Sequence, residues 1–330
     1  MINIGVIGSG SWGSALAILL DSNGHNVSIW THSPDILDKF NETRRLEHAL
    51  SGIDFPDTID LTDDMEAICS DKDLIVLVTA SPFIRSTLEN AKPYIKEGQI
   101  IVNASKGIED KSLLTLSDVI LDVIPEAEVA VLSGPSHAEE VSKGLPTTIV
   151  IGAENHETSS YLQDIFMNEN FRVYTSTDVL GIELGGALKN VIALAAGVSD
   201  GLGFGDNTKA ALMTRGLAEI ARLGVAMGGK SETFAGLSGV GDLIVTCSSI
   251  HSRNRMAGYY IGQGFSPKEA MEKVKQVVEG VHSAKAALTL SRQYKVEMPI
   301  VEQINLVLFE DKNAKEAVSD LLLRDKRKEF

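Results

Sequence analysis

Residues 8–13 read Gly8-Ser9-Gly10-Ser11-Trp12-Gly13, a G-x-G-x-x-G pattern near the start of a 330-residue chain. The β-branched run Asn3–Ile7 precedes the pattern, and a helical periodicity follows it from Ser14 to Ser22. In a strand–turn–helix unit of this kind, Gly8 permits the tight turn, Gly10 lets the backbone approach a pyrophosphate, and Gly13 permits close helix–sheet contact. The N–H groups and dipole of the helix N-terminus attract the same anion. The sequence therefore predicts a dinucleotide-binding domain.

Five more segments of the first half have the composition of buried strands. Most are continuous apolar runs, which is typical of a parallel sheet with helices on both faces. Helical segments alternate with them, among them Ser112–Val123, which ends before Pro125. This alternation predicts an α/β fold with an N-terminal doubly wound, Rossmann-type sheet. The five predicted strands are Asn26–Trp30, Asp73–Thr79, Gln99–Asn103, Glu128–Leu132 and Thr147–Ile151.

The pattern changes near residue 180. Strand-like runs end there, and helical periodicity continues, for example over Ser266–Val278 and Ala314–Leu323. Of the 29 glycines, 17 lie between Gly181 and Gly264. Because glycine in a helix costs about 1 kcal/mol relative to alanine, we expect close helix packing or a backbone that approaches a ligand. We predict a dinucleotide-binding domain over 1–180 and an all-helical substrate-binding and catalytic domain over 181–330.

The composition narrows the class of protein. The chain has 30 Lys and Arg against 45 Asp and Glu, a net charge of −15, which disfavours binding to nucleic acid or to anionic membranes. No apolar run reaches the roughly 18 residues that span a bilayer, and the N-terminus lacks the positive segment of a signal peptide. Cys69 and Cys247 are too few for a disulfide scaffold or a metal site. We expect a cytoplasmic protein without metal, with the basic cluster at 324–328 at a solvated helix end.

The second predicted strand ends in Trp30-Thr31-His32-Ser33, where an acidic residue would bind the ribose 2′-hydroxyl of NAD. No carboxylate is present, so a 2′-phosphate would meet no repulsion there. His32 could donate a hydrogen bond to that phosphate, and Arg44 and Arg45 could reach it. The sequence favours NADP and leaves NAD open; a surface turn is the other interpretation of His32.

Two polar segments follow predicted strands, at the sheet edge where ligands bind in open α/β folds. Ala104-Ser105-Lys106-Gly107 places a cation there, although a solvated loop lysine is the simpler alternative. The second segment runs from Ser133 to Glu139. Its Ser136 and Glu139 have the spacing of a capping box, which predicts another helix N-terminus suited to bind substrate or cofactor.

The helical half contains a lysine in an unusual setting. Lys189 shares a predicted helix face with Gly185, Ala193 and Ala196, so it stands over an indentation. A partly desolvated lysine can act as a general base, whereas an ion pair in a structural helix contact is the alternative. Downstream lies the polar run His251-Ser252-Arg253-Asn254-Arg255. An arginine followed by an amide residue suits phosphate binding, because its guanidinium matches phosphate oxygens, whereas an ordinary surface arginine is the alternative for Arg253.

Together these segments resemble the NAD(P)-dependent glycerol-3-phosphate dehydrogenase family in its bacterial form, over essentially the whole chain. The resemblance rests on the order and spacing of several short motifs. They are Gly8–Gly13, Ser105-Lys-Gly107, Ser133-Gly-Pro-Ser136, Leu188-Lys-Asn190 with Gly197-x3-Gly201-x3-Gly205, Gly239-Val-Gly-Asp242, Ser252-Arg-Asn254 and Val278-Glu-Gly280. The resemblance implies hydride transfer between NAD(P)H and dihydroxyacetone phosphate, which yields sn-glycerol 3-phosphate for phospholipid synthesis.

The resemblance also implies roles for individual residues. Lys189 is similar to the proton acceptor of the family, Lys106 to a second catalytic lysine, and Asp242 to the residue that positions Lys189. The implied substrate-binding residues are Lys106, Gly134, Ser136, Lys189, Asn190, Asp242, Thr246, Ser252, Arg253 and Asn254. The implied cofactor-binding residues are Gly8, Gly10, Ser11, Trp12, Gly13, His32, Lys106, Ala138, Arg253, Val277 and Glu279.

One segment departs from the family pattern, and several alternatives stay open. Residues 49–52 read Ala49-Leu-Ser-Gly52, where many members have an aromatic residue and a proline. A related two-domain dehydrogenase acting on a hydroxy acid, and a non-catalytic NAD(P)H-sensing protein, are the competing interpretations. The sequence also leaves open whether the chain forms a homodimer, in which direction it works, and whether it is feedback-inhibited.

Overall fold

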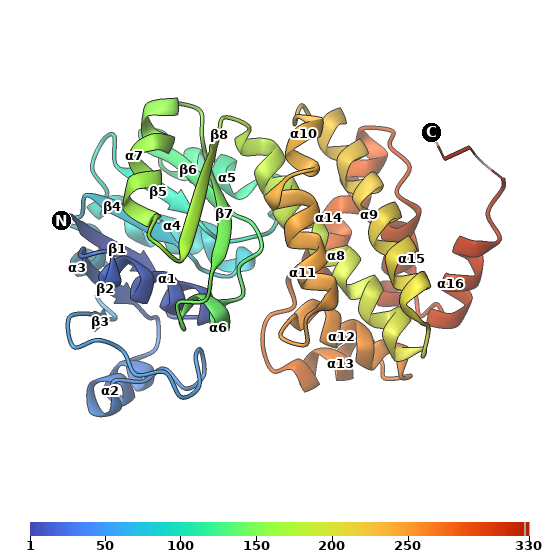
Figure 1. Cartoon of the computed structure of the whole chain (residues 1–330), viewed down its shortest axis with the longest axis horizontal. Helices are drawn as coiled ribbons and strands as arrows, with labels where there is room; N and C mark the ends of the chain where they lie inside the picture. Colours follow the sequence, from blue (N-terminus) through green and yellow to red (C-terminus); the bar gives the residue numbers. More distant parts are fainter. Residues whose placement is uncertain (327, 330) are drawn as a thin grey trace. The chain divides into compact units, whose positions relative to one another are not determined.

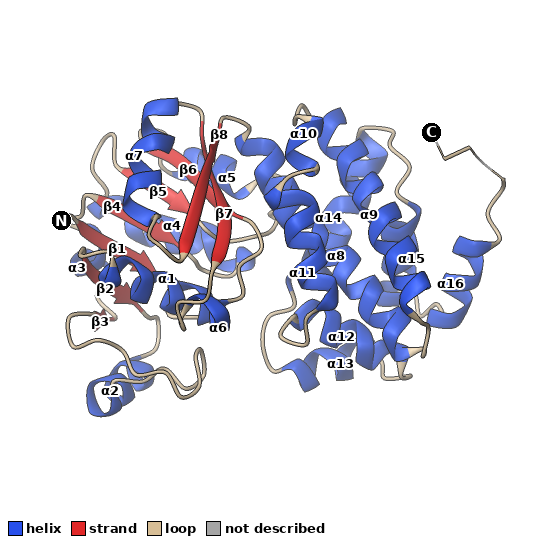
Figure 2. Cartoon of the chain, in the orientation of Figure 1, coloured by secondary structure: helices blue, strands red, loops and turns tan. Residues whose placement is uncertain are grey.

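The computed structural model describes residues 1–326, 328 and 329, which form two compact units. The sheet unit comprises Met1–Glu109 and Leu114–Glu183, and the helical unit comprises Asp110–Leu113 and Leu184–Phe330. Figure 1 labels their elements along the chain, and Figure 2 shows that strands occur in the first unit and helices in both. Arg327, part of the basic cluster at 324–328, lies outside the described residues.

The described part of the sheet unit holds an eight-stranded sheet of order β3-β2-β1-β4-β5-β6-β7-β8. Neighbouring strands are parallel except β6 and β7, which pair antiparallel with Val131 opposite Gly152. The Rossmann-type sheet is confirmed. The direction of β7 was not predicted, because an apolar run buried on both faces has the same composition in either direction. The strands are β1 Asn3–Ile7, β2 Asn26–Trp30, β3 Asp60–Thr62, β4 Leu74–Leu77, β5 Ile100–Asn103, β6 Glu128–Ser133, β7 Thr147–Ala153 and β8 Phe171–Ser176.

Short helices connect the strands. Helix α1 begins at Ser11, earlier than the predicted Ser14, and α5 begins at Leu116 rather than Ser112. The later start of α5 follows from its cap, since the Thr115 hydroxyl accepts a hydrogen bond from the Asp118 N–H. The helices of this unit are α1 Ser11–Ser22, α2 Pro34–Thr43, α3 Met65–Cys69, η1 Ser81–Phe83, α4 Ile84–Ala91, η2 Lys92–Tyr94, α5 Leu116–Val123, α6 Ala138–Val141 and α7 His156–Phe166.

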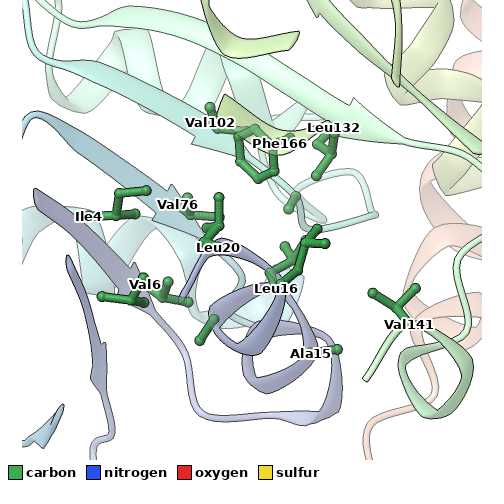
Figure 3. Close-up of a cluster of buried hydrophobic side chains, with 14 of the residues drawn as sticks. Ile4, Val6, Ala15, Leu16, Leu20, Val76, Val102, Leu132, Val141 and Phe166 are labelled. Atoms are coloured by element: carbon green, nitrogen blue, oxygen red, sulfur yellow. The ribbon is translucent and has the colours of Figure 1, made fainter. Parts of the chain in front are cut away.

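The central strands β1, β4 and β5 bury both of their faces. Val76 and Val102 point to one side, where they pack with Leu16 and Leu20 of α1 and Phe166 of α7 (Figure 3). The alternate positions of the same strands belong to a second cluster with α4 and α5, which includes Ile75, Leu77, Ile101, Leu88 and Val119. Two buried faces explain the continuous apolar runs in the sequence.

The described residues of the helical unit form helices and connecting loops, and no strand. One helix, α8, starts in the sheet unit and carries Lys189. The predicted helix Ser266–Val278 is observed as Pro267–Val274, and Ala314–Leu323 as Ala314–Leu322. The elements are α8 Val179–Gly201, α9 Asp206–Ala226, α10 Ser231–Phe234, the π-helix η3 Leu237–Gly241, α11 Asp242–Ser248, α12 Arg253–Gly262, α13 Pro267–Val274, α14 Glu279–Gln293, α15 Pro299–Phe309 and α16 Ala314–Leu322.

Helix α8 is long and apolar enough to span a membrane by length and composition, with a mean hydropathy of 1.5 over its most apolar window. Glu183 and Lys189 interrupt its apolar sequence, so the helix contains no continuous apolar run of 18 residues, as expected from the sequence. In the protein, 89% of that window is buried. This burial is typical of a core helix.

The glycine-rich composition has a packing cause where α8 and α12 cross. A Cβ at Gly197 would lie 1.9 Å from the Arg255 carbonyl oxygen, and a Cβ at Gly258 would lie 1.9 Å from that of Leu194. Gly201 and Gly262 show the same close approach to α12 and α8, respectively. Close packing, one of the two expected reasons, thus explains the glycines on these helices, and the crossing fixes the start of α12 against α8.

Gly258→Ala should destabilise the protein by about 3 kcal/mol or more, because the added methyl overlaps backbone that cannot rotate away. Chemical denaturation monitored by circular dichroism measures this loss. Gly205→Ala is the matched control: its Cβ would meet nothing within 4 Å, its φ is −87°, and a loss below about 1 kcal/mol is expected. Equal losses in the two variants would contradict the packing argument.

Candidate active site

The Gly8–Gly13 turn lies at the carboxyl end of β1, which has β2 on one side and β4 on the other. Strand order reverses here, and ligands of doubly wound sheets bind beyond the strand ends at this point. Gly8 has a φ of +132°, and a Cβ at Gly13 would lie 2.0 Å from the Gly8 carbonyl oxygen. A Cβ at Gly10 would meet no protein atom within 4 Å. Of these three glycines, Gly10 is therefore the one with open space beside it.

Helix α1 starts in this turn, and no side chain that the structure describes caps the N–H groups of its first turn. Gly10 is its N-cap and provides no side-chain hydrogen bond, and the first turn contains no acidic residue. The indole Nε1 of Trp12 is buried without a hydrogen-bond partner. Ser11 is the start of α1, and its hydroxyl donates to the Ala49 carbonyl over 2.6 Å. These residues fit a dinucleotide pyrophosphate, which would satisfy N–H donors at the helix start.

Gly10→Ala should leave the fold intact and weaken cofactor binding. Alanine fits the Gly10 φ of −74° and the empty space beside it, so the melting temperature should stay within a few degrees. The methyl would occupy the space through which a pyrophosphate approaches, and the affinity for NADPH should fall by roughly 10- to 100-fold. Titration of NADPH fluorescence measures this. Unchanged affinity would show that the cofactor does not approach Gly10.

Two histidines, His32 after β2 and His48 in the irregular segment after α2, lie near each other, and the sequence marked only His32. His32 is exposed, and its ring lies 6.5 Å from that of Trp30. Burial lowers the pKa of His48, a hydrogen bond with the Ser9 backbone opposes this, and the nearby His32 lowers it further. His48 thus lies near both Ser9 of the glycine turn and His32. Nothing in its local sequence marks it, because the chain returns to the turn through an irregular segment.

Arg44 and Arg45, which the sequence offered for a 2′-phosphate, both have partners within the protein. Arg44 lies 4.4 Å over the Phe40 ring and donates to the carbonyl oxygens of Pro56 and Ile59. Arg45 pairs with Asp54. Arg44 is the C-cap of α2 with a φ of 53°, which turns it back onto its own helix.

The two polar segments of the sheet unit meet. Lys106 follows β5 and donates from Nζ to the Gly134 carbonyl over 3.1 Å, and the Ser136 hydroxyl donates to the same oxygen over 3.0 Å. The predicted capping box at Ser136 is wrong. His137 is the N-cap of the short helix α6, which starts at the buried residue Ala138. Ser136 therefore lies two residues before the helix and bonds within its own turn.

Lys189 is the centre of a buried polar cluster in the helical unit. Only 6% of Lys189 is exposed, and Nζ donates to Asp242 Oδ1 over 2.9 Å and to Thr246 Oγ1 over 2.7 Å. A Cβ at Gly185 would lie 2.6 Å from the Ser238 carbonyl oxygen. The π-helix η3 thus packs on α8 one turn before Lys189. Helix α11 begins with Asp242, directly after η3. A buried ammonium requires such a carboxylate, because its isolated charge would be very costly.

The next residue of α8 connects this cluster to α12 and α14. Asn190 Oδ1 accepts a hydrogen bond of 2.9 Å from Asn254 Nδ2, and Asn254 Oδ1 accepts one of 2.8 Å from the Gly280 N–H. A Cβ at Gly280 would lie 2.6 Å from the Asn190 carbonyl oxygen. The half-buried residues Val277 and Glu279 flank this contact at the start of α14. Three predicted site segments therefore meet at one point of the helical unit.

The polar run His251–Arg255, at the start of α12, contains two arginines with different surroundings. Ser252 caps the helix and accepts a hydrogen bond from the Arg255 N–H. Arg255 bonds to Asp200 over 2.8 and 2.6 Å, and Lys209 pairs with the same carboxylate. Arg253 is exposed, and its side chain has no hydrogen bond or ion pair with any residue that the structure describes. Asp200 was not identified from the sequence, yet it determines which arginine is available.

The sequence patterns of one family match both units. That of the NAD-dependent glycerol-3-phosphate dehydrogenase N-terminus covers residues 3–176, and that of the C-terminus covers residues 178–319. The chain belongs to this family. The resemblance inferred from the short motifs is thereby confirmed.

Relatives named glycerol-3-phosphate dehydrogenase [NAD(P)+] match along the whole length. One from Agathobacter rectalis is 57% identical over 99% of this chain and 97% of its own, and one from Fusobacterium nucleatum is 56% identical over 100% and 99%. The crystal structure of glycerol-3-phosphate dehydrogenase from Coxiella burnetii has a TM-score of 0.95 at 36% identity and covers 98% of this chain and 99% of its own. Family membership thus rests on both units.

Proposed function

We propose that this protein reduces dihydroxyacetone phosphate to sn-glycerol 3-phosphate with NADPH or NADH, and catalyses the reverse oxidation. Family membership supports the proposal, and the observation that carries it is the buried Lys189–Asp242–Thr246 cluster. Arg253 precedes Asn254, which donates a hydrogen bond to Asn190, the residue after Lys189. The product would supply phospholipid synthesis, and we place the enzyme in the cytoplasm. A bound nicotinamide cofactor would supply or accept the hydride.

Lys189 acts as the proton-transfer group in this proposal. As an ammonium it donates a proton to the ketone oxygen during reduction, and as an amine it takes the proton of the secondary hydroxyl during oxidation. Asp242 and Thr246 fix Nζ by two hydrogen bonds, so the proton donor does not have to be ordered when substrate binds. Lys106 polarises the same oxygen by its charge.

The substrate phosphate binds at the start of α12. Arg253 offers a bidentate guanidinium, and the ten-residue helix contributes the positive end of its dipole, with no acidic residue in its first turn. Ser252 and Asn254 are held by the hydrogen bonds described above and shape this end of the helix. Gly134, Ser136, Asn190 and Thr246 complete the proposed substrate-binding residues.

The proposed cofactor site uses the glycine turn and its surroundings. Gly8, Gly10 and Gly13 form the turn, and Ser11 and Trp12 begin the helix whose N–H groups would bind the pyrophosphate. His32 contacts the adenosine ribose or its 2′-phosphate in this proposal. The remaining proposed contacts are Lys106, Ala138, Arg253, Val277 and Glu279.

Steady-state oxidation of NADPH and NADH tests the proposal. Dihydroxyacetone phosphate should be reduced, whereas unphosphorylated dihydroxyacetone and 2-keto acids should be nearly inert, because the phosphate contributes the binding energy that is used in the transition state. A higher kcat/KM on a keto acid would replace the proposal with a hydroxy-acid dehydrogenase. Cofactor binding without turnover of any of these compounds would indicate a sensor.

A further inference from the structure

Glu183 is a buried carboxylate that the mechanism above does not use. It lies on α8 in the sheet unit, and 7% of it is exposed. Its Oε1 accepts hydrogen bonds of 2.9 Å from both Asn103 Nδ2 and the Ser117 N–H. Its Oε2 is buried and has no hydrogen-bond partner among the residues that the structure describes. A carboxyl group of this kind is costly to bury, and apolar packing alone would not require it.

The contacts of Glu183 lead to the turn that carries Lys106. Asn103 is the last residue of β5 and is fully buried. Its Oδ1 accepts a hydrogen bond of 3.0 Å from the Ser105 N–H, and the Ser105 hydroxyl donates to the Thr79 carbonyl over 2.6 Å. A chain of hydrogen bonds thus runs from Glu183 through Asn103 to the residue preceding Lys106.

We propose that Glu183 is a positioning residue of the reaction, which holds the Ser105–Lys106 turn through Asn103. The proposal rests on the proposed function, in which Lys106 polarises the substrate oxygen. When Glu183 is ionised, its Oε1 is a charge-assisted acceptor and holds Asn103 firmly. When it is protonated, the same contact weakens and the turn gains freedom.

The surroundings of Glu183 allow this change near neutral pH. Burial raises its pKa to about 7, although the hydrogen bonds from the Ser117 N–H and from Asn103 oppose the shift. These groups face it from β5 and from the start of α5, and none is charged. On the adjoining segments, Asp118 accepts a hydrogen bond from the Thr115 hydroxyl, and Asp178 accepts one from the Gly181 N–H. Glu183 is therefore ionised above and protonated below about pH 7.

Four variants test the proposal in the full-length enzyme: Glu183→Gln, Lys106→Ala, their double variant, and Glu219→Gln. Glu219 is the matched control, because burial also raises its pKa to about 7, but it accepts hydrogen bonds from the N–H groups of Ile300 and Val301 at the start of α15. Glutamine at 183 keeps the acceptor for Asn103 and cannot ionise.

The kcat/KM for dihydroxyacetone phosphate is measured between about pH 6 and pH 8 for all variants. The wild type should lose roughly fivefold on going to the lower pH, and Glu183→Gln should be roughly fivefold below the wild type at the higher pH and lack this dependence. In the Lys106→Ala background, Glu183→Gln should have no further effect. Glu219→Gln should keep the wild-type profile.

Three results would overturn the proposal: a Glu183→Gln profile equal to that of the wild type, an equal effect of Glu183→Gln with and without Lys106, or the same loss of pH dependence in Glu219→Gln. If Glu183→Gln does not fold, the pH profiles of kcat/KM for the wild type and Lys106→Ala are compared instead. A pH dependence that persists without Lys106 contradicts the positioning role. A wild type inactive on dihydroxyacetone phosphate would instead refute the proposed function.

Discussion

Lys189→Arg should lower kcat for the reduction of dihydroxyacetone phosphate by roughly 10³- to 10⁴-fold. Arginine keeps the positive charge and can still pair with Asp242, which lies 2.9 Å from Nζ in the native protein. It does not release its proton at neutral pH. The variant therefore separates proton transfer from the structural role of the ion pair, which was the alternative interpretation of this lysine.

Lys189→Ala should lose at least as much activity, but it also leaves the buried Asp242 without its ammonium partner. Breaking a buried pair in this way costs about 3–5 kcal/mol, so the melting temperature of Lys189→Ala should fall further than that of Lys189→Arg. Steady-state turnover and thermal unfolding are measured for both variants. NADPH affinity should remain near that of the wild type. More than a tenth of the wild-type kcat in Lys189→Arg would rule out the proton-transfer role.

Arg253→Ala should lower kcat/KM for dihydroxyacetone phosphate by roughly 10²- to 10³-fold, the scale of a lost charge-assisted, bidentate contact. The weak activity on unphosphorylated dihydroxyacetone should hardly change, because that compound has no phosphate to lose. The variant should therefore reduce the preference for the phosphorylated substrate by the same factor. The fold should tolerate it, since the exposed side chain has no polar partner in the described part of the chain.

The control for Arg253→Ala is Arg292→Ala, which removes an exposed cation from the last turn of α14. Both variants lower the net positive charge of the helical unit by one, so a long-range electrostatic effect on the anionic substrate would appear in both. We expect a change below about twofold in Arg292→Ala. Equal losses on both substrates in Arg253→Ala would place the phosphate elsewhere.

The sequence predicted those parts of the fold that depend on local composition. The bounds of β1 and β2 agree with the predicted segments, because short apolar runs end there in turn residues. The strands β3 and β8 were not predicted. Both lie at sheet edges. The three-residue strand β3 is too short for a periodic signal, and β8 alternates between buried and exposed residues instead of forming an apolar run.

The family resemblance implied that Asp242 positions Lys189, and the structure confirms this pair, whereas the residue pattern alone did not pair them. Lys189 and Asp242 are 53 residues apart, and only the packing of η3 on Gly185 brings them together. The choice of Arg253 over Arg255 depends on Asp200, which follows from the helix crossing rather than from a local pattern. Nothing in the local sequence distinguishes Glu183 from an ordinary charged residue of a helix. Its role becomes visible only through its hydrogen bonds to Asn103 and Ser117.

A crystal structure with bound cofactor and dihydroxyacetone phosphate tests the central claim most directly. We predict that Lys189 Nζ lies within about 3.2 Å of the ketone oxygen of the substrate, and that the Arg253 guanidinium binds the phosphate with two N–H···O hydrogen bonds. A substrate phosphate bound away from the start of α12, or a ketone oxygen beyond the reach of Lys189, would contradict the account.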